Sequence, residues 1–222
     1  MIAAMLLVAS LAMAQDDAEY RLELGGGVGM LAYQGDFNGN LLKGMKPMAM
    51  LSARHKPNPR MAWALNLGMG SIKGDYNNAH NFYPELTESQ RSFSNTVFDG
   101  GARFEYNFWP FGTGRDYRGA KPLTPFITLG AGITFADTDG GSVVCANFPI
   151  GGGVKYKIAK RLNLTAEWTM HFSTSDKLDG VADPHGIKSS GMFKNKDSYS
   201  MLVVGLTYDI WAKCRTCHND DD

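Results

Sequence analysis

The chain has 222 residues, of which 44% are hydrophobic, 11% aromatic and 20% charged. Lys and Arg together number 22, as do Asp and Glu, so the formal net charge of zero gives no electrostatic reason to expect a nucleic-acid partner. The 26 glycines, together with the aromatic content, are typical of a β-protein whose backbones approach closely.

The first 14 residues, MIAAMLLVASLAMA, form an apolar run that ends in Ala-Met-Ala. An apolar stretch followed by small residues is the pattern of a secretory signal peptide, although a buried helix or a retained anchor would look similar. No later stretch reaches 18 consecutive apolar residues, so we expect no transmembrane helix after it. We therefore predict an exported protein with a signal peptide over 1–14, one domain over 15–211 and a tail over 212–222.

Eight segments then alternate between apolar and polar residues, which is the period of a β-strand. In 98–108, for example, Phe98, Ala102 and Phe104 fall on one face, whereas Asp99 and Arg103 fall on the other. The segments lie at about 20–33, 47–56, 61–70, 98–108, 124–134, 149–158, 162–172 and 202–210.

The lengths of the connections indicate what surrounds these strands. The predicted connections 34–46, 75–92, 136–148 and 174–197 are long, those after the second and sixth strands are a few residues, and 109–123 is intermediate. Long loops at one end and short turns at the other are typical of an outer-membrane barrel with both termini in the periplasm. Segments of about ten residues also suit a tilted crossing of the hydrocarbon layer.

A soluble lipocalin-like barrel or a sandwich is the alternative, and it would place apolar residues inside. The apolar faces of this chain are broad and aromatic, while its polar faces combine glycines with Arg, Glu and Lys, as a narrow lumen filled by side chains requires. We therefore predict an all-β fold, an eight-stranded antiparallel transmembrane β-barrel in the outer membrane, with surrounding lipid as a partner.

Nine charged side chains are predicted to face the lumen, five basic and four acidic, and buried charges must be paired. Such a network would make the barrel rigid and leave little room for conduction. Its predicted members are Arg21, Glu23, Arg54, Arg103, Glu105, Lys155, Lys157, Glu167 and Asp209.

Several stretches, in order, resemble the PorG-like outer-membrane barrels, a family that includes the barrel component of the type 9 secretion system. They are EYRLELGGGVGMLAYQGDFN, NPRMAWALNLGMGSIKGDY, FDGGARFEYNFWPF, LTPFITLGAGITF and PIGGGVKYKIAKRLNLTAEW, with FSTSDKLDGV after them. The resemblance extends to about Trp211 and includes Gly-Asp pairs at 35–36 and 74–75. It implies a non-enzymatic protein that contacts the periplasmic ring lipoprotein of the secretion and gliding machinery, although a paralogue could have another role.

Three cysteines in an exported chain leave at least one unpaired within the monomer. Cys214 and Cys217, followed by His218, match the haem-attachment pattern, but the surrounding tail is polar and offers no haem pocket, so we expect no cofactor. A disulfide or a covalent tether to a periplasmic partner is the preferred interpretation. Cys145 falls in a predicted extracellular loop and would be free or face a partner.

One pattern favours an enzyme. His171-Phe172-Ser173 resembles the His-x-Ser of outer-membrane lipid A deacylases, in which a serine nucleophile needs a nearby histidine and an orienting acid. No glutamate follows Glu167, and the alternation points His171 into the barrel, away from lipid. We predict no catalytic or metal site. The predicted function is anchoring a periplasmic assembly through 109–122 and the tail from Lys213, with a stand-alone passive or ligand-binding barrel as the alternative.

Overall fold

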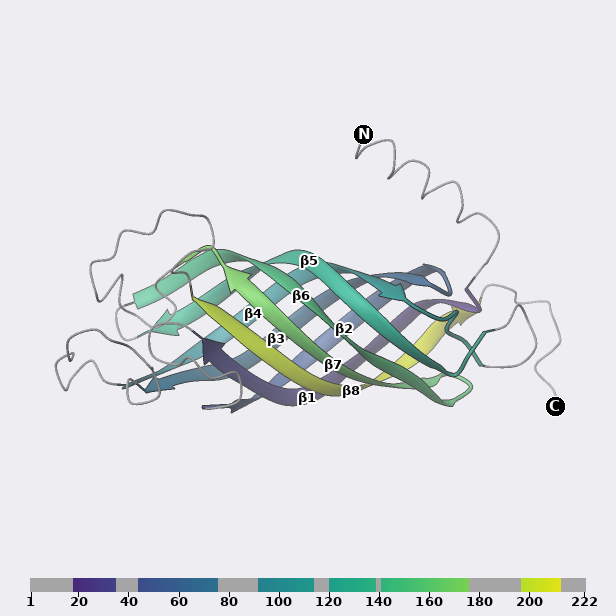
Figure 1. Ribbon diagram of the computed structural model, residues 1–222, viewed down its shortest axis with the longest axis horizontal. Coiled ribbons are helices and arrows are strands. Elements are labelled where there is room, and N and C mark those ends of the chain that lie inside the picture. Colours follow the sequence, from purple (N-terminus) through teal and green to yellow (C-terminus); the bar gives the residue numbers. More distant parts are fainter. Residues whose placement is uncertain are drawn as a thin grey trace, which may run out of the picture.

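The computed structural model describes residues 18–34, 44–75, 92–113, 120–138, 141–175 and 197–212. Its strands form one closed antiparallel barrel in which each strand pairs with the next and β1 pairs with β8 (Figure 1). The predicted eight-stranded barrel is confirmed. The strands are β1 (Tyr20–Gln34), β2 (Lys46–Asn58), β3 (Met61–Asp75), β4 (Ser92–Asn107), β5 (Leu123–Thr138), β6 (Gly141–Ala159), β7 (Leu162–Ser173) and β8 (Ser198–Ala212).

The two ends of the barrel differ in their connections. We call one the turn end: Tyr20 pairs with Ala212 there, and the β2–β3, β4–β5 and β6–β7 connections lie there. The opposite, loop end holds the β1–β2, β3–β4, β5–β6 and β7–β8 connections. Within the described residues, no helix is long and apolar enough to cross a membrane.

The surface of the barrel is apolar and the interior holds the buried charged side chains, with an apolar cluster toward the loop end, because alternate residues of each strand point to opposite faces. Leu51 is 66% exposed on β2, Leu67 is 65% exposed on β3 and Ile133 is 60% exposed on β5. This distribution is the reverse of that in a soluble barrel and requires lipid around the strands. Other exposed apolar residues include Val28, Trp63, Leu65, Leu129, Val144, Ile150, Trp168, Val204, Leu206 and Trp211.

The β5–β6 connection is much shorter than the sequence suggested. The predicted long loop 136–148 is wrong, since β5 continues to Thr138 and β6 begins at Gly141. The alternation persists through this stretch, with Val144 exposed and Asn147 buried. The Thr138 hydroxyl donates a hydrogen bond of 2.6 Å to the carbonyl of Gly141, which adopts a φ of 116° that favours glycine.

Close approach of neighbouring strands explains why the polar face contains glycine. A Cβ placed on Gly130 of β5 would lie 2.2 Å from the carbonyl oxygen of Ala102 and 2.9 Å from Cγ of Arg103 on β4. Any side chain there would displace the backbone or the stem of the arginine. The small residue thus makes room for a large charged neighbour inside a narrow barrel.

Candidate functional site

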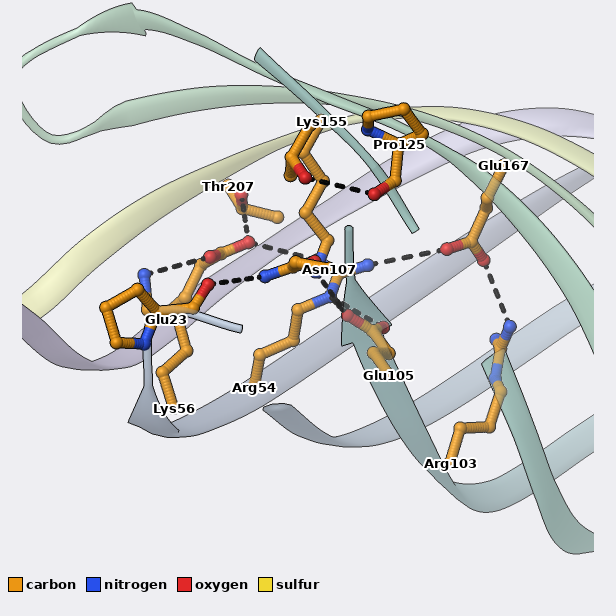
Figure 2. A network of polar contacts seen from close by, with 12 residues as sticks. Glu23, Arg54, Lys56, Arg103, Glu105, Asn107, Pro125, Lys155, Glu167 and Thr207 are labelled. Carbon is orange, nitrogen blue, oxygen red and sulfur yellow. Dashed lines mark hydrogen bonds and ion pairs between the residues drawn. The ribbon is translucent and has the colours of Figure 1, made fainter. Parts of the chain in front are cut away.

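The interior is organised around Arg54 of β2, whose guanidinium reaches three other strands (Figure 2). Its Nε lies 3.0 Å from Oε1 of Glu105 on β4, and its Nη1 lies 3.1 Å from Oε1 of Glu23 on β1. Its Nη2 lies 3.4 Å from Oε2 of Glu167 on β7. Since all four side chains are buried, these charge-assisted contacts bridge opposite walls of the barrel.

Two further basic residues complete this central layer. Lys155 Nζ on β6 lies 2.5 Å from Glu105 Oε2, and Arg103 Nη1 on β4 lies 3.1 Å from Glu167 Oε1. Each of these carboxylates therefore receives two basic partners, which offsets the cost of removing it from water.

A second layer lies toward the turn end. Lys56 of β2 forms ion pairs with Asp209 of β8 and with Glu23, the latter at 3.1 Å. Lys157 Nζ of β6 donates to Asp209 at 2.7 Å and to Asn163 Oδ1 at 3.1 Å. We call these two layers together the ion network, and we define it as Glu23, Arg54, Lys56, Arg103, Glu105, Lys155, Lys157, Glu167 and Asp209.

Arg21 is the exception among the predicted lumen residues, because it is exposed outside the barrel. The pairing of β1 with β8 is irregular opposite it: Trp211 has a φ of 66°, and the buried Tyr20 faces inward in its place. Lys56, which the sequence analysis left out, supplies the missing positive charge. Ser52, Arg54 and Lys56 are alternate residues and therefore lie on the same face of the strand. Extending the alternation to the end of the predicted second segment would have identified Lys56 as a lumen residue.

A third cluster of polar residues lies closer to the loop end. Asp99 Oδ2 accepts hydrogen bonds from Asn147 Nδ2 at 2.6 Å and from the Tyr199 hydroxyl at 2.7 Å. The Tyr33 hydroxyl donates to Asp197 Oδ1 at 2.5 Å. Sequence reasoning missed these tyrosines because each lies at the loop end of its strand, outside the clear alternation. Packed with them are the buried apolar residues Leu31, Met48, Met50, Ile72, Val97, Ala136, Cys145, Met201 and Val203.

The residues that suggested enzyme chemistry lie inside the barrel. His171 Nε2 is 3.2 Å from Thr169 Oγ1, and its Nδ1 is 3.6 Å from Asp99 Oδ2. Ser173 Oγ donates to the carbonyl of Ser175 at 3.1 Å. A lipid-modifying pair would have to face lipid, whereas both of these side chains are buried.

Cys145 corrects another expectation. It is a buried free thiol on β6, with Sγ 3.3 Å from Ser173 Oγ, and does not lie in an extracellular loop facing a partner. The reason is the extension of β6 to Gly141, which turns this residue inward.

Cys214 and Cys217 lie outside the described residues. Within the described part of the chain, no three His, Cys, Asp or Glu side chains are grouped as a metal site.

The β4–β5 connection folds across the turn end. Phe111 is buried there, and its backbone N–H donates to the carbonyl of Pro59 at 3.1 Å. A parallel bridge joins Phe111 to Lys121, whose N–H donates to the Pro110 carbonyl at 2.7 Å. Lys157 Nζ lies 5.4 Å from the centre of the Phe111 ring. We call residues 108–113 and 120–122 the turn-end cover.

Long buried side chains occupy the lumen that the structure describes, since Arg54, Arg103, Lys155 and their carboxylate partners meet across it. A cavity of about 10 Å³ lies beside Arg54, Thr165 and Thr207, and another of about 10 Å³ is lined by Tyr20 and Phe111 at the turn end. Each has roughly the volume of one water molecule.

These features define a small, side-chain-filled transmembrane β-barrel of the outer-membrane class. The fold is similar to that of Neisserial surface protein A (NspA), with a TM-score of 0.53 and 14% identity over 85% of this chain and 97% of that chain. It is also similar to Ail, the attachment invasion locus protein of Yersinia pestis, in complex with the heparin analogue sucrose octasulfate. That comparison gives a TM-score of 0.50 and 12% identity over 87% of this chain and 100% of that chain. No protein-family model and no curated protein matches the sequence.

Proposed function

We propose that this barrel is a non-enzymatic outer-membrane component of the type 9 secretion and gliding machinery, and that it anchors or aligns a periplasmic ring lipoprotein complex. The partner class comes from the resemblance of the ordered strand sequences to PorG-like barrels. The observation that carries a scaffold role is the filled interior, because a barrel without a continuous path has no use as a channel.

The ion network supports this role energetically. Arg54 joins three carboxylates from three strands, so any change in barrel shape would separate buried charges. Removing one partner of a buried ion pair costs about 3–5 kcal/mol. A barrel with this interior resists deformation, as an anchor in a mechanical assembly requires.

The turn-end cover is the proposed contact surface, with both termini on the periplasmic side. The Arg60 guanidinium donates to the Phe108 carbonyl at 2.7 Å, and the Trp109 N–H donates to Thr124 Oγ1 at 3.1 Å. These bonds fix the cover to the barrel, so a partner held there would be held in a defined orientation. The tail after Ala212 begins at the same end, and Cys214 and Cys217 are proposed to add a disulfide or a tether to the partner.

A detergent pull-down tests the proposal. Wild-type protein and the Cys214→Ser/Cys217→Ser variant are captured with and without reductant, and Cys145→Ser serves as the matched control because its thiol is buried. Co-purification of a periplasmic lipoprotein supports the anchor, and its loss in the double variant alone assigns the contact to the tail. A clean monomer in every sample would instead support a stand-alone passive or ligand-binding barrel.

A further inference from the structure

Basic side chains surround the turn end. Arg21, Lys121 and Arg161 are exposed there, and Arg60 is half-buried. Glu19 is the only exposed acid at this end among the residues that the structure describes, because Glu23, Glu105 and Asp209 point into the barrel. Among the described residues, exposed positive charge is thus concentrated at this end of the barrel. We call Arg21, Arg60, Lys121, Lys160 and Arg161 the basic rim.

The basic rim follows the whole circumference. Arg21 begins β1, Arg60 lies in the β2–β3 turn and Lys121 lies in the β4–β5 connection. Lys160 and Arg161 form the β6–β7 turn. Since the strands close in sequence order, these positions are distributed around the barrel. One protein partner would occupy one side, whereas a lipid leaflet surrounds the barrel completely.

Aromatic rings accompany two of the cations. Lys121 Nζ lies 4.9 Å from the centre of the Trp109 ring, and Arg161 Cζ lies 5.4 Å from that of Tyr20. Trp109 is 40% exposed and Trp211 is 69% exposed at the same end. Exposed tryptophans lie preferentially at headgroup depth, where an adjacent Lys or Arg reaches phosphate oxygens, whereas Tyr20 is buried inside the barrel and supports Arg161 from within.

We propose that the basic rim binds the phosphates of anionic glycerophospholipid headgroups in the leaflet that meets the turn end, and so sets the depth of the barrel. The loop end lacks this arrangement in its described part, where Lys46 and Lys73 are accompanied by the exposed Asp137. The proposal does not depend on a role in secretion, because it concerns only the barrel and its bilayer.

Tryptophan fluorescence provides the test, since Trp63, Trp109 and Trp211 lie near the turn end. Full-length protein is refolded into phosphatidylcholine vesicles that contain brominated phosphatidylglycerol, and quenching gives the relative binding constant of the two lipids. We expect wild-type protein to prefer phosphatidylglycerol about 2–5-fold and Arg60→Gln/Lys121→Gln/Arg161→Gln to approach a ratio of about 1. Lys121→Gln alone, a milder change, should reduce the preference partially.

Three controls make the result specific. Lys46→Gln/Lys73→Gln removes two charges from the loop end and should retain the preference. Arg60→Lys/Arg161→Lys keeps the rim charge and should retain most of it. High salt should weaken the preference, because exposed charges are screened.

Other outcomes would overturn the proposal. One is that the wild-type protein shows no preference for phosphatidylglycerol, and another is that Lys46→Gln/Lys73→Gln loses the preference as fully as the rim variant does. A third is that soluble glycerol phosphate abolishes the preference, which would indicate a site for free anions. If the wild-type protein shows no lipid preference and Arg60→Gln/Lys121→Gln/Arg161→Gln fails to capture a periplasmic lipoprotein, the basic rim binds an acidic protein partner and not lipid headgroups.

Discussion

Arg54 on β2 and Glu105 on β4 are joined across the interior by two contacts, 3.0 and 3.2 Å from the arginine Nε to the two carboxylate oxygens. The strand between them, β3, contributes Asn66 and Ala64 at inward positions, which are too short to reach this pair. Long side chains from non-adjacent strands therefore meet over small neighbours, and this arrangement fills the barrel.

Arg54→Met should destabilise the folded barrel by about 3–5 kcal/mol, because Glu23, Glu105 and Glu167 would each lose a buried basic partner. Urea unfolding in lipid vesicles, followed by tryptophan fluorescence, measures the change. Lys73→Gln is the control: the residue is exposed at the loop end, and its effect should stay within about 0.5 kcal/mol. In the double variant Arg54→Met/Glu105→Gln, the loss should be smaller than the sum of the single changes. Equal stability of Arg54→Met and wild type would contradict the role of the ion network.

Gly130→Ala should cost about 1–3 kcal/mol, since the added Cβ would lie 2.2 Å from a backbone oxygen of β4. The matched control is Gly68→Ala, whose Cβ would meet nothing closer than the flexible Met48 Cε at 3.4 Å. The same urea titration compares the two variants. If they were equally tolerated, strand spacing would not require glycine at position 130.

The Cys145 thiol should resist a water-soluble maleimide in the folded barrel and react once the barrel is unfolded, because it is buried on β6. Labelling of a Cys214→Ser/Cys217→Ser variant, read by mass spectrometry, isolates this thiol. As a positive control, Lys73→Cys with Cys145→Ser places a thiol at an exposed position and should label quickly. Rapid labelling of Cys145 in the folded state would show that the loop end opens to water.

Much of this fold follows from the alternation of residues along the chain, because lipid outside and charges inside give every strand two unlike faces. The prediction failed where that contrast is weak. Around residues 136–148 the glycines and Asp137 read as a loop, although backbone pairing with β5 extends the strand. The alternation in the sequence places Arg21 on the inward face, but its side chain is exposed. The backbone of the paired strand is irregular at Trp211, and the residues around Arg21 give no sign of that irregularity. Pairings such as Tyr33 with Asp197, 164 residues apart, depend on barrel closure and have no local signal.

Wild-type protein in a planar bilayer should show no regular conductance steps, because the ion pairs of Arg54 join β2 to β1, β4 and β7 across the described lumen. A hydrated ion needs a continuous path, and the ion network and the turn-end cover block it within the described residues. Single-channel recording at both polarities checks this expectation. Stable, reproducible steps would exclude a filled barrel and favour a passive pore.

Phe111→Ala should loosen the turn-end cover without unfolding the barrel. The Phe111 ring is the buried side chain of the cover and lies 5.4 Å from Lys157 Nζ, whereas the ion pairs of Arg54 hold the strands without contacting this ring. We therefore expect faster hydrogen–deuterium exchange of the Lys121 amide, whose N–H donates to the Pro110 carbonyl, together with unchanged protection of the strands and weaker capture of the proposed periplasmic lipoprotein. Phe108→Ala is the matched control, because this neighbouring ring is 47% exposed and its loss should leave exchange at Lys121 unchanged. Faster exchange with undiminished capture would remove the cover from the proposed contact surface and leave the tail as the remaining candidate. No change in exchange would show that the backbone hydrogen bonds to the carbonyls of Pro59 and Pro110 suffice to hold the cover in place.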